Sequence, residues 1–216
     1  MQLLEDPSYN GVFDAGPYEE IQDVTPLKEG DTIDLDGITL RIYEVPGHSK
    51  DHIAILDEKN RHIFVGDAIG NKVADQTFLP PFMPPSWDPD AFLSSINKLK
   101  QISYESLCLS HFGYIYGDEA KSILDEAVLI YETWWHLFEE NADKLDDVDY
   151  TLETVMKEIS PGIPEIRILS LKIKVLFALM TGWRKLVGKR PQPLGELLLR
   201  GIIGQLTTGY RTYKKP

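Results

Sequence analysis

Residues 38–67 read ITLRIYEVPGHSKDHIAILDEKNRHIFVGD, and their pattern is the strongest indication of the fold. Apolar Ile38, Leu40 and Ile42 alternate with Thr39, Arg41 and Tyr43, a period of two that is typical of a strand with one buried face. Two more short apolar runs follow at 53–56 and 62–65. The dipeptide Asp36-Gly37 just before the stretch is a hairpin signal, with 32–35 as the partner strand. The stretch therefore predicts consecutive strands of one sheet.

Farther along, the pattern turns helical. A proline-rich loop at 79–85 precedes Asp88-Pro89-Asp90, a helix-start signal for 90–101, and 107–109 reads as a short buried strand. From Asp118 on, apolar residues step by three and four, which predicts a helix with one buried face, and further helices are expected near 152–159, 165–186 and 193–213. We expect Trp134, Trp135 and Trp183 to pack in a core or interface instead of forming a ligand cage.

Composition excludes some classes of function. The 216 residues are 43% hydrophobic and 26% charged, ordinary for a globular protein, and the formal net charge of −12 argues against a nucleic-acid partner. The longest apolar stretch, 166–180, is interrupted by charges and falls short of the roughly 20 apolar residues that span a membrane. No signal peptide is visible, and the lone Cys108 is expected to be a small buried hydrophobe. These features predict a soluble cytoplasmic protein without a membrane partner.

Three polar side chains occupy the same kind of position, just beyond a predicted strand and next to a glycine or serine. His48 follows Pro46-Gly47, Asp67 follows Gly66, and His111 follows Ser110. Strand ends at one edge of a sheet converge, and two imidazoles with a carboxylate are ligands that zinc or iron favours. Each residue alone is more often an ordinary turn or surface-cap residue. The occurrence of three in order shifts the balance, and the spacing by itself leaves both interpretations open.

The residues resemble a known family. The runs Val45-Pro46-Gly47-His48-Ser49 with Asp51-His52, Phe64-Val65-Gly66-Asp67-Ala68, Trp87-Asp88-Pro89 and Leu107 to Gly113 are similar to the second half of a metallo-β-lactamase-fold hydrolase, in its glyoxalase II-like branch. The resemblance covers about residues 27–115. It implies an α/β fold, with 1–115 as the C-terminal half of an αββα sandwich and 116–216 as a mainly helical region that caps or extends it.

The resemblance also implies roles for these residues. His48 would ligate a first metal ion, Asp67 would bridge two ions and serve as the catalytic carboxylate, and His111 would ligate the second ion. His52 would lie in the second shell, while His62 and His136 match no family position and are expected on a strand start and a helix. The metals would be two zinc ions, with iron or manganese as alternatives. A bridging hydroxide would attack an ester, thioester or amide carbonyl of a small-molecule substrate.

The sequence departs from the family at its start. The family's first half carries His-x-His-x-Asp-His, and no histidine precedes His48 here. Each ion would keep two protein ligands, fewer than the three or four that zinc usually has, and the missing sheet would leave apolar surface on strands 38–65 uncovered. Two explanations are open. The chain is an N-terminally truncated form of an active hydrolase, which we favour, or a non-catalytic half-domain that serves as a binding or oligomerisation module, with a homo-oligomer as one outcome.

Overall fold

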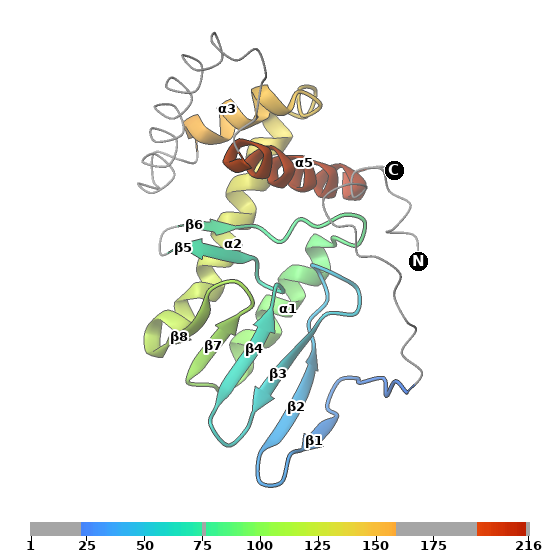
Figure 1. The fold of residues 1–216 in the computed structure, drawn as a ribbon, viewed down its shortest axis with the longest axis vertical. Coiled ribbons are helices and arrows are strands. Elements are labelled where there is room, and N and C mark those ends of the chain that lie inside the picture. Colours follow the sequence, from blue (N-terminus) through green and yellow to red (C-terminus); the bar gives the residue numbers. More distant parts are fainter. Residues whose placement is uncertain (1–22, 75–76, 159–193, 215–216) are drawn as a thin grey trace, which may run out of the picture.

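The structure is a computed structural model that describes residues 23–74, 77–158 and 194–214 (Figure 1). Its main sheet has six strands in the order β1-β2-β3-β4-β7-β8. They are β1 (Thr32–Asp34), β2 (Thr39–Glu44), β3 (Ile53–Asp57), β4 (His62–Gly66), β7 (Ser106–Leu109) and β8 (Gly113–Tyr116). A separate hairpin pairs β5 (Asn71–Ala74) with β6 (Thr77–Leu79). The helices are α1 (Pro89–Gln101), α2 (Gly117–Glu140), α3 (Val148–Glu158) and α5 (Leu194–Lys214).

The predicted α/β class and helical C-terminal region are confirmed, and the predicted strands and helices all appear where residues are described. The turn at Asp36-Gly37 has positive φ at both positions (57° and 102°), as a tight hairpin turn requires. His62 begins β4 and His136 lies on α2, as expected. The helix predicted at 165–186, with Trp183, lies outside the described residues.

Three strands were not predicted. β5 and β6 are short and polar in part, and β6 takes three residues that include the start of the predicted proline-rich loop. β8 has four residues and pairs antiparallel with β7 in a register that runs from Ser106 opposite Tyr116 to Leu109 opposite Gly113. Strands of this length carry too few residues to show a period of two, so only their partners define them.

The direction of the strands sets the position of their ends. β1 to β4 pair antiparallel in sequence order, whereas β4 and β7 pair parallel. A parallel pair needs a crossover connection, and here it contains the β5–β6 hairpin and α1. Consequently β2, β4 and β7 run in the same direction and finish at the same edge of the sheet (Figure 1).

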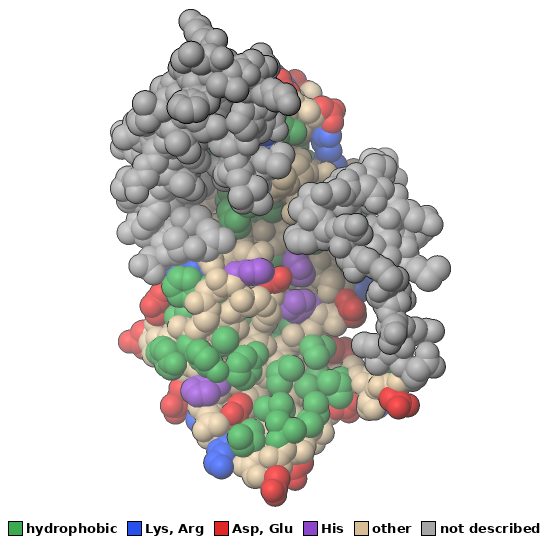
Figure 2. All heavy atoms as spheres, viewed as in Figure 1, with side chains coloured by type: hydrophobic (Ala, Val, Ile, Leu, Met, Phe, Trp, Pro, Cys, Tyr) green, Lys and Arg blue, Asp and Glu red, His purple; other side chains and the backbone are tan. Residues whose placement is uncertain are grey.

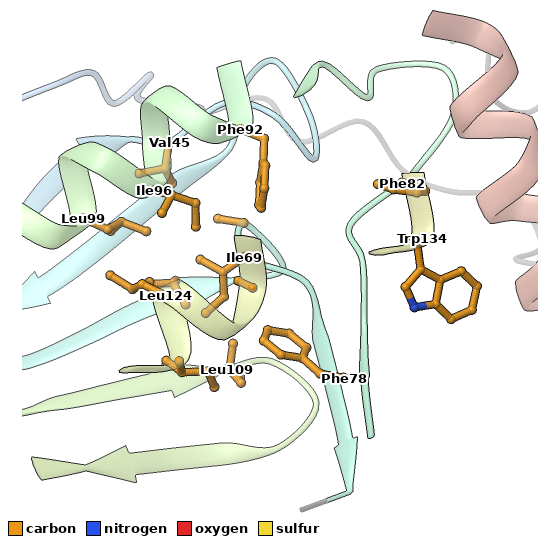
Figure 3. Close-up of a cluster of buried hydrophobic side chains, with 14 of the residues drawn as sticks. Val45, Ile69, Phe78, Phe82, Phe92, Ile96, Leu99, Leu109, Leu124 and Trp134 are labelled. Carbon is orange, nitrogen blue, oxygen red and sulfur yellow. The ribbon is translucent and has the colours of Figure 1, made fainter. Parts of the chain in front are cut away.

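Helices α1 and α2 cover one face of the main sheet, the far face in Figure 1. The side chain of Asp88 caps α1 by accepting a hydrogen bond from the Ala91 amide at 3.0 Å. Phe92, Ile96 and Leu99 of α1 then pack with Leu124 of α2 in the buried cluster shown in Figure 3. The sheet contributes alternate residues to the same cluster: Ala54, Leu56, Ile63, Val65, Leu107, Leu109 and Ile115.

The two tryptophans of α2 are packing residues, as predicted. Trp134 is 3% exposed. Trp135 contacts Tyr210 of α5 with ring centroids 4.7 Å apart, so the C-terminal helix packs on α2. Because the first turns of α2 share the core of the sheet, the division of the chain at 115/116 into two domains stays a prediction. Within the described ranges, none of the helices combines the length and the apolar character that crossing a membrane requires.

The opposite face of the sheet carries a row of apolar side chains, and none of the described helices lies over it. The cross-strand register aligns one partly or largely exposed residue from each of four strands, namely Ile55, Phe64, Cys108 and Tyr114. Ile42 shares this register but is fully buried. Phe64 is 36% exposed and Tyr114 is 43% exposed, and green side chains spread over this face in Figure 2. We call this row, together with Tyr116, the open face.

Cys108 belongs to the open face and is half-buried, so it is less enclosed than the small buried hydrophobe that was expected. The alternation of the strand explains the difference, because Leu107 and Leu109 point into the core and Cys108 points away from it. Burial still raises the pKa of the thiol. The group therefore stays protonated at neutral pH, which agrees with a packing role.

Candidate metal centre

The predicted ligands His48, Asp67 and His111 lie together at the edge where β2, β4 and β7 end. His48 Nε2 is 3.9 Å from Asp67 Oδ2, and His111 Nε2 is 3.6 Å from Asp67 Oδ1. Asp67 thus stands between the two imidazoles with one oxygen toward each. Histidine side chains gather above the apolar patch of the open face in Figure 2. The common direction of the three strands brings these residues together, although they are far apart in the sequence.

His48 is held by the loop that follows β2. Gly47 has a φ of 141°, and a Cβ there would lie 2.6 Å from the Cα of Phe92, so only glycine lets α1 approach this closely. The Gly47 carbonyl accepts a hydrogen bond from the Asp88 amide at 2.9 Å, and the Ser95 hydroxyl donates to the Pro46 carbonyl at 2.7 Å. The first turns of α1 therefore fix the His48 backbone.

The His48 imidazole has a defined tautomer. Nδ1 is 3.2 Å from the Pro81 carbonyl oxygen, which can only accept a hydrogen bond, so Nδ1 carries the proton and Nε2 presents its lone pair to Asp67. Burial lowers the pKa of His48 below its ordinary value, in spite of the opposing effects of the Pro81 carbonyl and Asp67. The ring is therefore neutral at pH 7, and its contact with Asp67 is not an ion pair.

Asp67 follows β4 directly and has an unsatisfied oxygen. Its side chain is 25% exposed, yet Oδ1 is buried and accepts no hydrogen bond from the described residues. An oxygen left in this state loses its hydration without a replacement, which costs about 1–3 kcal/mol and more for a charged group. A cation or an added proton donor would satisfy it.

His52, the predicted second-shell residue, lies beside His48 just before β3. Its Nε2 is 3.0 Å from the Val65 carbonyl, and its ring meets that of His48 edge-on with centroids 5.5 Å apart. Gly66 makes room for it, because a Cβ on Gly66 would be 2.7 Å from His52 Nε2. The ring thus packs under the turn that carries Asp67. Its role toward a metal stays a prediction.

His111 is the least enclosed of the three predicted ligands. Its side chain is 60% exposed, and the turn that carries it lies between β7 and β8. The backbone of this turn is tied to the Asp67 segment by Ser110, whose amide is 3.5 Å from the Gly66 carbonyl. His111 therefore faces Asp67 from an open rim of the site.

The donor set fits a transition metal in kind: two imidazole nitrogens, one of them oriented by a backbone carbonyl, and a carboxylate with a bare oxygen. It is too small in number to enclose an ion. In the part of the chain that the structure describes, no three His, Cys, Asp or Glu side chains are grouped so that they could hold a metal. The assignment of these residues as metal ligands therefore stays a prediction.

Two contributors to this site were not found by sequence reasoning. The Pro81 carbonyl that orients His48 and the Ser95 hydroxyl that holds its loop come from distant segments. Backbone carbonyls carry no sequence signal, and Ser95 reads as one polar position on a helix. Beside the site, a groove of about 450 Å³ runs onto the open face and is lined by Ser49, Asp51, His52, Phe64, Cys108 and Ser110, among others.

The chain is similar to several known proteins over part of their length. A curated hydroxyacylglutathione hydrolase from Hahella chejuensis is 32% identical over 79 residues, which are 36% of this chain and 28% of that protein. Among solved structures, the metallo-beta-lactamase family protein TTHA1429 from Thermus thermophilus aligns with a TM-score of 0.45 and 18% identity, over 89% of this chain and 49% of that one. TTHA1623, solved in a di-iron-bound form, aligns with a TM-score of 0.35 and 24% identity, over 47% and 46%.

The chain spans 28% of that curated relative and less than half of each of those two structures. The family profile described as the Metallo-beta-lactamase superfamily matches residues 3–111, which contain all three predicted ligands. That match covers half of the chain, including every strand of the main sheet except β8. The protein belongs to the metallo-β-lactamase superfamily.

Proposed function

We propose that this chain carries half of the metal centre of a hydrolase that acts on a small ester, thioester or amide substrate. The observation that carries the proposal is that His48 Nε2 and the Asp67 carboxylate, both electron-pair donors, face each other without a proton between them. His48 directs the lone pair of Nε2 at the Asp67 carboxylate, since its proton is used by the Pro81 carbonyl. The other oxygen of Asp67 is buried without a hydrogen-bond donor among the described residues.

Such an arrangement is costly unless a cation lies between the groups. A lone pair and a carboxylate repel each other, and burial strengthens the repulsion. A metal ion would convert both contacts into attractive ones. In metal-binding histidines the second ring nitrogen commonly donates to a backbone carbonyl, as His48 Nδ1 does.

In this proposal His48 and Asp67 hold one ion, and Asp67 and His111 hold the second, so that Asp67 is the shared and central carboxylate. Zinc is the first expectation, with iron or manganese as alternatives. A bound ion would polarise the substrate carbonyl and activate water. His52 would orient the Asp67 side chain by fixing the turn at Gly66 that precedes it. The acidic balance of −12 favours a small molecule over a nucleic acid, and the single cysteine favours a cytoplasmic location.

We further propose that the chain is an N-terminally truncated form of that hydrolase. Two features support this. The three ligands are too few for two ions. The open face also exposes apolar side chains such as Phe64 and Tyr114 that a second sheet would cover. Reading the genomic sequence upstream in frame tests the idea, because a stop codon close before Met1 without a His-x-His-x-Asp-His motif would contradict it.

The alternative is a non-catalytic module that binds a partner or a second copy of itself, and the open face is the observation that favours it. Sedimentation combined with metal analysis separates the two. A stable oligomer without metal supports the module, whereas a metal-loaded monomer supports the hydrolase.

Metal binding by the chain tests the proposed ligands directly. We expect zinc affinity, measured by titration calorimetry and by metal content after desalting, to fall by more than roughly a hundredfold in Asp67→Ala and in His111→Ala, which exceeds the loss that a supporting residue usually gives. His136→Ala is the matched control, because His136 lies on α2 and pairs with Glu140 at 3.1 Å, away from the site. Equal zinc affinity in all four proteins would contradict the assigned ligands.

Hydrolase activity is expected only of a protein that also contains the missing first half of the domain. Thioesterase and lactonase assays on a version extended upstream should give turnover that Asp67→Ala abolishes. Turnover that survives this substitution unchanged would remove Asp67 from the reaction, even if zinc still binds elsewhere.

A further inference from the structure

One charged side chain beside the site is buried and lacks a role in the proposal above. The side chain of Lys72, on β5, is only 5% exposed. Burying an ammonium group is costly unless it is paired, so a buried lysine needs an explanation. Its Nζ lies 3.6 Å from Glu119 Oε1 in the first turn of α2, and 5.3 Å from the centre of the Phe112 ring.

Phe112 is the residue next to His111. The turn from Ser110 to Phe112 is exposed: the side chain of His111 is 60% exposed and Phe112 is 38% exposed. Its backbone contact with the Asp67 segment, from the Ser110 amide to the Gly66 carbonyl, is long at 3.5 Å. The contact of Lys72 with the Phe112 ring therefore gives this turn a second support, on the far side of His111.

Lys72 also connects the segment that carries Asp67 with the turn that carries His111. It lies on β5, the strand that follows Asp67. Between the two, Gly70 packs closely against β6 at the start of the hairpin: a Cβ on Gly70 would be 2.4 Å from the Leu79 carbonyl oxygen. The Lys72 ammonium thus joins three elements: the strand that follows Asp67, the turn that carries His111, and the start of α2.

We propose that Lys72 is a positioning residue for His111. By contacting the Phe112 ring while it pairs with Glu119 of α2, it keeps the His111 imidazole beside Asp67. It acts through Phe112 and does not touch the ligand nitrogens. This inference rests on the proposed function in so far as His111 is a ligand.

The test uses this chain and two readouts. The first is the imidazole ¹H–¹⁵N NMR spectrum of the metal-free protein. In wild type, His111 should give shifts displaced from those of a free imidazole, and in Lys72→Met they should move to the free values. The second is zinc affinity, which should fall about tenfold in Lys72→Met, the loss typical of a residue that supports a metal ligand. Lys72→Arg should largely restore the wild-type His111 shifts and zinc affinity, since a guanidinium keeps the charge and the ring contact.

Two further variants sharpen the result. Phe112→Leu removes the ring at an exposed position and should reproduce the Lys72→Met spectrum, so that the proposal can be tested even if Lys72→Met fails to fold. Lys100→Met is the matched control, because Lys100 also pairs with a carboxylate of α2, Asp125, but lies away from the site. It should leave the His111 shifts and the zinc affinity unchanged.

The outcomes separate the two proposals. Zinc affinity that is equal in wild type, Asp67→Ala and His111→Ala contradicts the proposed ligands, while the His111 spectrum still tests Lys72. If zinc binds and both Lys72→Met and Phe112→Leu leave the His111 shifts unchanged and the affinity within about twofold of wild type, far from the loss expected of a supporting residue, the positioning role is wrong. An effect of Lys100→Met equal to that of Lys72→Met would also overturn it, since the loss would then be a general one.

Discussion

At the scale of single residues, the candidate site depends on backbone positions that only glycine fits. Gly66 has a φ of 57°, in the left-handed region, and its missing Cβ leaves room for His52. The sequence marks it only as a glycine before an aspartate. The structure adds the reason, which is that the Asp67 turn and the His52 ring share one space.

Gly66→Ala should therefore destabilise the protein through two effects. The left-handed backbone costs about 1–2 kcal/mol for an alanine, and the clash with His52 adds to it. Gly117→Ala is a matched control, because Gly117 has a φ of 60° and no atom within 4 Å of its would-be Cβ. Urea unfolding of both variants should show a larger loss for Gly66→Ala. Equal losses would mean that the contact with His52 has no energetic weight.

At the scale of elements, the N-terminus of α1 supports the site from behind. Asp88 caps the helix through its side chain, while its backbone amide holds the Gly47 carbonyl next to His48. The start of α1 and the loop that carries His48 are thus joined through Asp88. The sequence predicted the cap, but not that the helix would lie against Gly47.

Asp88→Ala removes the cap and should lower the free energy of unfolding by about 1 kcal/mol. Asp88→Asn keeps an oxygen that accepts from the Ala91 amide, so its stability should stay near that of wild type. Denaturant unfolding measures both. If Asp88→Asn loses as much as Asp88→Ala, the charge of Asp88 matters and its capping bond does not.

At the scale of the whole molecule, the sheet is covered on one side only in the described residues. Sheets with one apolar face exposed usually cover it with another layer, since exposed apolar patches mark interaction sites. Whether the cover is an upstream segment or a partner, the open face is where the chain is expected to make its largest contact. The described helices α3 and α5 do not fill that place, because α5 packs with α2 and with α3 beyond the end of the sheet (Figure 1).

The open face should bind an apolar dye such as anilinonaphthalene sulfonate in the folded protein. The double variant Phe64→Ser with Tyr114→Ser should reduce the fluorescence markedly, because it removes two of the exposed side chains of the row. Leu129→Ser is the control, since Leu129 is 61% exposed but lies on α2. Fluorescence that responds to Leu129→Ser and not to the double variant would place the apolar patch elsewhere.

The sequence was enough to predict the strands around 38–67, the start of α1, the apolar stripe of α2 and the polar residues that follow β2, β4 and β7. These depend on periodicity and turn chemistry between near neighbours in the chain. Only the tertiary structure decided which oxygen of Asp67 is bare, that the Pro81 carbonyl sets the His48 tautomer, that β8 exists, that Cys108 is half-buried on an open face, and that Lys72 reaches Phe112. Each of these follows from contacts between separate segments of the chain, and a local pattern carries no information about them.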